Sequence, residues 1–194
     1  MIKLKICGMR DAANIKAVAE LRPDYMGFIF YEKSPRFVGH EFKVSGVNAV
    51  GVFVNESTQK ILEKGVEIVQ LHGDEPASQV DELKGEGLSV IKAFSVDDNF
   101  DFTKTKNYKA DYFLFDTKGK YYGGNAKTFN WKKLEEYDQR TPFFLSGGLN
   151  ADNLKDLDIL KGMNLHAIDL NSGVEDAPGI KNIEKIKSVM SCLK

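Results

Sequence analysis

Short runs of apolar residues recur along the chain, and longer stretches of mixed polarity separate them. Some runs are almost continuously apolar, such as MGFIF (26–30), VGVFV (50–54) and YFLF (112–115). Runs of this kind are typical of parallel strands that are covered on both faces. The pattern predicts eight strands: Ile2–Cys7, Tyr25–Phe30, Ala49–Val54, Glu67–Leu71, Ser89–Phe94, Tyr112–Asp116, Pro142–Leu145 and Ala167–Leu170.

The segments between these runs carry the apolar spacing and the capping residues of helices. We predict helices at Asp11–Glu20, Ser57–Lys64, Glu75–Leu83, Asn130–Tyr137, Asn150–Leu157 and Lys181–Met190. Two segments are weaker. Phe37–Gly46 has room for only a short helix, and Asp97–Lys109 is polar and poorly periodic. The alternation of strands and helices predicts βα units around a parallel sheet.

The number of units favours a closed barrel. Eight strands in 194 residues leave about 24 residues for each unit, enough for a strand, a short helix and two tight loops. We predict an α/β fold of the (β/α)8 TIM-barrel type rather than an open doubly wound sheet, because no GxGxxG turn follows the first strand. Since barrels usually have about 250 residues, some helices should be shortened, first in the two weak segments. No linker divides the chain, so residues 1–194 are expected to form one domain.

Composition narrows the classes of partner. Lys and Arg number 27 and Asp and Glu number 28, so a formal net charge of −1 creates no field that selects a polyanion or an anionic membrane. The chain also lacks the apolar stretches of a membrane span and of a secretory signal. Cys7 and Cys192 are too few for a disulfide framework and have no metal-ligand spacing, which indicates free thiols in the cytoplasm. We therefore expect no nucleic acid, no membrane and no metal as partners.

Polar residues and glycines gather where the predicted strands end, which is where barrel enzymes place their active sites. These positions are Cys7-Gly8, Ser34-Pro35-Arg36, Asn55, His72-Gly73, Asp116-Thr117, Ser146-Gly147-Gly148 and Asp169 with Asn171-Ser172-Gly173. A barrel with a purely structural role would not require this arrangement. The active site is therefore expected at this end of the barrel.

Two glycine loops follow the seventh and eighth strands, LSGGLN (145–150) and NSGVE (171–175). Barrels commonly bind a phosphate at these places through backbone N–H groups. Tight turns would explain either loop alone, but the pair at this position favours phosphate binding. Arg36 is a second candidate anion ligand, because a guanidinium can hold a carboxylate or phosphate with two hydrogen bonds. A solvated surface arginine is the alternative.

Cys7 and Asp116 form the candidate acid–base pair. A cysteine at a strand end is more often a small buried apolar residue, but alternation along the strand places Lys5 on the same side, and an ammonium there would lower the pKa of the thiol. Asp116 ends an apolar run, so a partly desolvated carboxyl could supply a proton, although a local turn is the alternative. His72 and Asp169 are expected to line the pocket or complete its rim.

Longer motifs extend over nearly the whole chain. They are KICGM (5–9), GFIFYEKSPR (27–36), VGVFVN (50–55), VQLHGDE (69–75), LFDTKGKYYGGNAKTFNW (114–131), LSGGLN (145–150) and IDLNSGVE (168–175). In this order they resemble the phosphoribosylanthranilate isomerase family of tryptophan biosynthesis. The combination of KICG with FDT and FNW is the most specific part of the resemblance.

The resemblance implies an Amadori rearrangement of N-(5-phosphoribosyl)anthranilate to 1-(2-carboxyphenylamino)-1-deoxyribulose 5-phosphate, without a metal or organic cofactor. Asp116 would be the general acid that opens the furanose ring to a Schiff base, and Cys7 would be the general base that removes the C2 proton. Arg36 would hold the anthranilate carboxylate, and Gly147-Gly148 with Ser172-Gly173 would hold the phosphate. We expect a monomer or a homodimer.

Two positions depart from the family pattern. Asn125-Ala126-Lys127 stands where the family has a small residue, a glycine and a lysine, and Asn171 stands where the family has the first serine of SSGVE. Alanine does not readily adopt a glycine-only backbone conformation, so the loop after the sixth strand can differ in shape. Another phosphosugar isomerase or epimerase barrel and a non-catalytic phosphosugar-binding barrel are the alternatives. The joint presence of Cys7 and Asp116 argues against the second.

Overall fold

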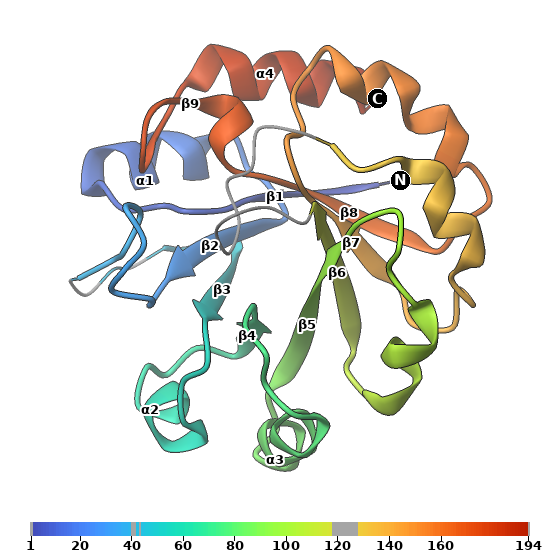
Figure 1. Cartoon of the computed structure of the whole chain (residues 1–194). Coiled ribbons are helices and arrows are strands. Elements are labelled where there is room, and N and C mark those ends of the chain that lie inside the picture. The colour runs from blue at the N-terminus through green and yellow to red at the C-terminus, as the bar shows by residue number, and fades with distance from the viewer. Residues whose placement is uncertain (1, 40–41, 43, 118–127, 194) are drawn as a thin grey trace.

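Eight parallel strands close into a barrel in their sequence order, with helices around the outside (Figure 1). The computed structural model describes residues 2–39, 42, 44–117 and 128–193. The strands are β1 (Lys3–Ile6), β2 (Tyr25–Ile29), β3 (Asn48–Phe53), β4 (Ile68–Leu71), β5 (Ser89–Val96), β6 (Tyr112–Thr117), β7 (Phe143–Leu145) and β8 (Leu165–Leu170). The pairing of β1 with β8 completes the ring. The predicted (β/α)8 barrel is therefore confirmed.

Helical segments connect most of these strands. The α-helices are α1 (Ala12–Glu20), α2 (Thr58–Leu62), α3 (Ala77–Gly85) and α4 (Ile183–Cys192). The 3₁₀ helices are η1 (Phe102–Asn107), η2 (Trp131–Glu136), η3 (Asn153–Leu160) and η4 (Ser172–Val174). A two-stranded hairpin of β9 (Glu175–Ala177) and β10 (Ile180–Lys181) precedes α4. The sequence pattern did not predict this hairpin.

Several of the predicted α-helices are 3₁₀ helices in the structure. The predicted helices at Asn130–Tyr137 and Asn150–Leu157 are 3₁₀ rather than α-helical, with backbone N–H groups that bond three residues back, as from Tyr137 to Leu134. The residues described between β2 and β3 contain no helix, and the segment Asp97–Lys109 holds only the 3₁₀ helix η1. The segment Asp97–Lys109 is thus shortened as expected, and the described residues of Phe37–Gly46 add no helix.

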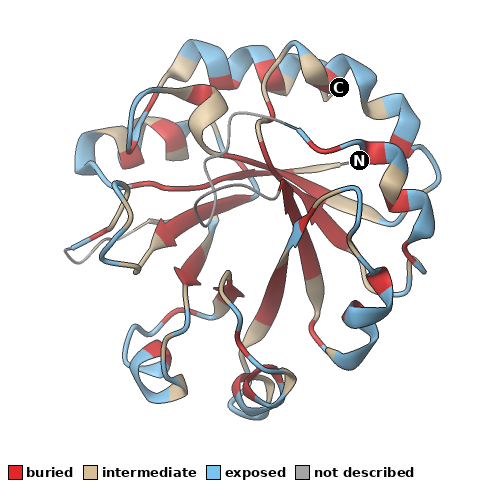
Figure 2. Ribbon diagram, in the orientation of Figure 1, coloured by how far each residue is buried: buried red, intermediate tan, exposed pale blue. Residues whose placement is uncertain are grey.

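Apolar side chains fill both sides of the strands. The inner cluster fills the barrel with Tyr25, Val50, Ile91, Ala93, Leu114, Phe144 and Ala167. A larger cluster lies between the strands and the surrounding helices. Figure 2 shows the result as buried strands inside helices whose outer faces are exposed. Each large side chain that is fully buried contributes about 1.5–3 kcal/mol, so this double core holds the strand ends in place.

The register of the barrel shifts between β7 and β8, near the amino-terminal end of the barrel. Phe143 of β7 is opposite Leu165, but Phe144 is opposite Ala167, so His166 is an extra residue in β8. Its ring lies 4.5 Å from that of Tyr112, and its Nε2 atom lies 2.8 Å from the Tyr25 hydroxyl. A bulge of this kind redirects a side chain, and here it turns an imidazole toward the interior.

Candidate active site

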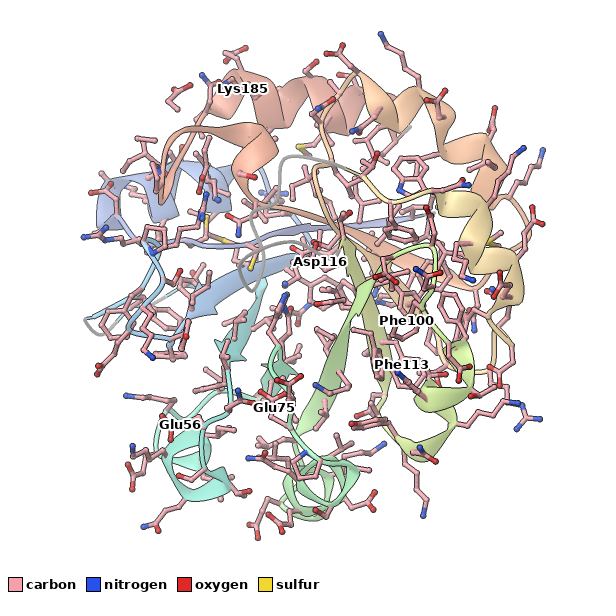
Figure 3. The ribbon with its side chains drawn as sticks, viewed as in Figure 1. Glu56, Glu75, Phe100, Phe113, Asp116 and Lys185 are labelled. Carbon is pink, nitrogen blue, oxygen red and sulfur yellow. The ribbon has the colours of Figure 1, made fainter. Side chains whose placement is uncertain are left out.

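A pocket opens where the barrel strands end. Side chains alternate along each strand, so every second residue points into the barrel and the last inward residue of a strand lines the pocket. The lining includes Cys7, Ile29, Tyr31, Ser34, Val52, Val54, Gln70, His72, Asp116, Ser146, Gly147, Gly148, Leu149, Asp169, Asn171, Ser172 and Gly173. Figure 3 shows Asp116 near the middle of the ring of strands. The structure therefore brings the predicted acid, base and glycine loops to one pocket.

Cys7 is buried, with 4% of its surface exposed. Burial raises the pKa of the Cys7 thiol above its ordinary value, and this effect outweighs the opposite effects of Lys5 and Lys181. The predicted lowering of this pKa is therefore wrong. Its physical reason is the burial of the thiol: Lys5 acts in the predicted direction, but burial outweighs it, and Asp169, which pairs with Lys5 at 2.7 Å, also raises the pKa.

A chain of buried polar contacts connects Lys5 to Asp116. Lys5 Nζ donates to Gln70 Oε1 at 2.6 Å, and Gln70 Nε2 lies 2.6 Å from His72 Nδ1. On the other side of its ring, His72 Nε2 lies 3.3 Å from Asp116 Oδ2, close enough for an ion pair although the two atoms are not aligned as a hydrogen bond. His72 thus lines the pocket, as expected, and it also contacts the candidate acid.

Asp116 is 3% exposed, so its carboxyl is desolvated as expected. Its Oδ1 atom accepts a hydrogen bond from the backbone N–H of Thr117 at 2.9 Å, and its Oδ2 atom faces His72. Asp116 therefore makes the local contact that a turn would provide, and it lines the pocket at the same time.

Arg36 is held by a carboxylate of the same chain. Its Nε and Nη2 atoms both donate to Glu175, and the shortest distance is 2.6 Å. Lys181 Nζ donates to Glu175 at 2.6 Å and to Asn171 Oδ1 at 2.8 Å. Burial alone would raise the pKa of Glu175, but Arg36 and Lys181 hold it below its usual value. Arg36 is thus a fixed side chain of this cluster rather than a solvated surface arginine, and it is not among the residues that line the pocket.

The two glycine loops touch each other. Gly147 and Gly148 have φ values of 94° and 66°, which favour glycine, and a Cβ atom on Gly147 would lie 2.6 Å from the backbone nitrogen of Thr117. A Cβ atom on Gly173 would overlap the carbonyl oxygen of Leu149. The loops therefore require glycine for their turns and for their mutual contact, and they lie side by side in the pocket. Asn125-Ala126-Lys127 lies outside the described residues.

Sequence reasoning missed three residues of this region: Gln70, Glu175 and Lys181. Gln70 is a polar residue inside an apolar strand, two positions before His72, and that spacing places both side chains in the barrel. This signal was present in the sequence. The contact of Glu175 with Arg36 joins residues 139 positions apart, and no local pattern indicates it.

Within the described residues, no group of three or more His, Cys, Asp or Glu side chains is arranged to hold a metal ion. None of the helices that the described residues form has the length and apolar character that a membrane crossing requires.

A closed (β/α)8 barrel whose strand ends bring a cysteine, a histidine and two aspartates into one pocket with paired glycine loops defines a barrel enzyme of the acid–base type. The family described as N-(5'-phosphoribosyl)anthranilate (PRA) isomerase matches residues 4–191. The chain belongs to this family, which makes it an isomerase and confirms the resemblance found in its motifs.

Individual relatives agree with this assignment. The N-(5'-phosphoribosyl)anthranilate isomerase of Phocaeicola vulgatus is 44% identical, over 98% of this chain and 97% of the relative. The crystal structure of phosphoribosyl anthranilate isomerase from Thermotoga maritima has a TM-score of 0.86 at 35% identity and covers 99% of this chain and 98% of that chain. Another solved structure, of phosphoribosyl anthranilate isomerase in complex with reduced 1-(o-carboxyphenylamino)-1-deoxyribulose 5-phosphate, has a TM-score of 0.82 at 33% identity and covers 98% of this chain and 97% of that chain.

Proposed function

We propose that the chain catalyses the Amadori rearrangement of N-(5-phosphoribosyl)anthranilate to 1-(2-carboxyphenylamino)-1-deoxyribulose 5-phosphate in tryptophan biosynthesis. The observation that carries this proposal is the placement of Cys7 and Asp116 in one pocket with both glycine loops. The reaction needs an acid, a base and an anion site, and these residues can supply all three.

Asp116 acts first, as the general acid. Its protonated carboxyl donates a proton to the furanose ring oxygen, the bond between that oxygen and C1 breaks, and the anilino nitrogen forms the Schiff base. The aspartate left behind is stabilised by the Thr117 N–H on Oδ1.

Cys7 acts second, as the general base. Its thiolate removes the proton from C2, and the electron pair of that bond moves to the Schiff base and gives an enolamine, which tautomerises to the ketone. Because burial raises the pKa of Cys7, only part of the protein carries the thiolate at neutral pH. Lys5 and Lys181 favour the thiolate and limit this cost.

Each anionic end of the substrate has its own proposed binding group. Backbone N–H groups of Gly147, Gly148, Ser172 and Gly173 are proposed to bind the phosphate, because both loops line the pocket. Arg36 is proposed to bind the anthranilate carboxylate. Glu175 engages the Nε and Nη2 edge of the guanidinium, so the Nη1 edge would meet the substrate.

The test follows the fluorescence decay of freshly generated phosphoribosylanthranilate with and without the protein. Asp116→Asn and Cys7→Ser should each reduce turnover by about 100-fold or more, because each removes a proton-transfer group. Circular dichroism checks that the variants fold. No acceleration by the wild-type protein, together with turnover of a different phosphosugar, would contradict the proposed substrate.

We also propose a cytoplasmic enzyme that is a monomer or a homodimer. The free thiols Cys7 and Cys192 support the compartment. Sedimentation of the purified protein would determine the oligomeric state.

A further inference from the structure

We propose that Gln70 is a positioning residue that fixes His72 as the tautomer with its proton on Nε2, so that the imidazole donates toward Asp116 and cannot take the proton of the acid. The inference rests on the proposed function, because it assigns His72 a role in proton donation by Asp116. It follows from which atoms along the contact chain can donate and which can accept.

The orientation of the Gln70 amide is set by Lys5. Burial alone would lower the pKa of Lys5, but Asp169 and Cys7 raise it above its ordinary value, so Lys5 is an ammonium with donors only. The Gln70 atom 2.6 Å from Lys5 Nζ is therefore the carbonyl oxygen Oε1. The amide nitrogen Nε2, which only donates, then faces His72. Gln70 is 1% exposed, so no solvent competes for these contacts.

The orientation of the amide decides the tautomer of the histidine. Gln70 Nε2 lies 2.6 Å from His72 Nδ1, so Nδ1 must accept and cannot carry a proton. In a neutral ring the proton then resides on Nε2, which lies 3.3 Å from Asp116 Oδ2. A hydrogen on Nδ1 would point at the amide N–H of Gln70, so this contact leaves Nδ1 without a hydrogen.

The tautomer matters for the acid step. If Nε2 carried no proton, it would accept the proton of Asp116 and withhold it from the substrate. If the ring were an imidazolium, the charge would keep Asp116 ionised. A neutral ring with a proton on Nε2 avoids both outcomes, and its N–H can stabilise the aspartate once the proton has gone to the ring oxygen. The gap of 3.3 Å leaves room for the contact to tighten as the reaction proceeds.

The first measurement is the tautomer of His72 in the wild-type protein, by nitrogen-15 NMR of the ring near neutral pH. We expect a neutral ring with hydrogen on Nε2 and a bare Nδ1. A ring protonated on Nδ1, alone or together with Nε2, would overturn the proposal. This measurement needs no substrate, so it stands apart from the proposed function.

The second measurement uses Gln70→Glu, which keeps the shape and the partner of Lys5 but presents an acceptor to Nδ1. We expect Nδ1 to become protonated and kcat to fall about 10- to 100-fold with KM little changed, the range expected for a lost hydrogen bond to a charged group. Gln59→Glu makes the same change on the exposed face of α2 and should leave kcat unchanged.

An unchanged kcat in folded Gln70→Glu would overturn the proposal. If that variant does not fold, the tautomer measured in the wild-type protein decides. Failure of the wild-type protein itself to turn over phosphoribosylanthranilate would overturn the proposed function instead.

Discussion

The reactivity of Cys7 depends on a balance between burial and neighbouring charge. Lys5 and Lys181 favour the thiolate, whereas burial and Asp169 favour the thiol, and the net effect raises the pKa of Cys7. The side on which a residue faces can be predicted from strand alternation, so Lys5 could be placed beside Cys7 from the sequence. The depth of burial and the pairing of Lys5 with Asp169 depend on the closed barrel, and the sequence alone did not show them.

This balance predicts the pH dependence of the reaction. The base is the thiolate, and a raised pKa means that the thiolate fraction still increases above neutral pH. We expect kcat/KM to increase between pH 7 and pH 9 by up to about tenfold per pH unit, as for a single deprotonation. The thiolate absorbance of the wild-type protein, less that of Cys7→Ser, should follow the same curve. A kcat/KM that is flat across this range would contradict the role of Cys7 as the base.

The positions of the strands and the capping residues of the first helices could be predicted from the sequence. Asp11 and Ser57 cap α1 and α2 through side-chain hydrogen bonds, where the sequence placed both helix starts. The helix predicted from Glu75 instead begins at Ala77, because Glu75 has a different role. It is buried between β4 and α3, where it accepts from the N–H groups of Asn55 and Gly73 and from Lys92 Nζ at 2.8 Å. The carboxylate thereby connects the ends of β3 and β4 to the middle of β5.

Removing this carboxylate should be costly. Glu75→Ala leaves the Lys92 ammonium buried without its carboxylate and two backbone N–H groups without an acceptor. We expect the free energy of unfolding to fall by about 3–5 kcal/mol, measured by urea denaturation. Glu184→Ala is the matched control, since it breaks an exposed pair with Lys187 and should cost about 1 kcal/mol or less. Equal losses in the two variants would contradict this account of the loop junction.

At the scale of the whole molecule, the closed barrel could be predicted because the eight apolar runs and their similar spacing are visible along the sequence. The details that escaped prediction depend on closure. The β9–β10 hairpin carries Glu175 and Lys181, which meet Arg36 from the other end of the chain. The extra residue in β8 places His166 among Tyr25, Tyr112 and Phe144, and no pattern within β8 indicates that position.

His166 should make the stability of the barrel sensitive to acid. Burial lowers the pKa of His166 below its ordinary value of 6.5, and Lys3 lowers it further, while Asp24 acts in the opposite direction. The unfolded chain therefore binds a proton at a higher pH than the folded chain. The free energy of unfolding is at its full value above about pH 6.5 and decreases as the pH falls below it, by at most about 1.4 kcal/mol per pH unit for one proton.

The comparison of wild type with His166→Phe isolates this effect, because phenylalanine keeps an aromatic ring but does not titrate. Urea denaturation from pH 7.5 to pH 5 should show wild type losing stability faster than the variant. If the difference in stability between wild type and His166→Phe stays constant over this range, protonation of His166 does not cause the loss of stability in acid.

The contact between Lys5 and Asp169 joins residues 164 positions apart, across the junction of β1 and β8. Lys5 also orients Gln70 and favours the thiolate of Cys7. The chemistry of the pocket therefore depends on the ion pair between Lys5 and Asp169 of β8. Ribosomal synthesis proceeds toward the carboxyl terminus, so Lys5 and Cys7 leave the ribosome before β8 does. Until β8 has emerged, Lys5 lacks its partner Asp169 and the pocket around Cys7 is incomplete. A chain that is still being synthesised therefore carries the reactive groups before it can be catalytically active.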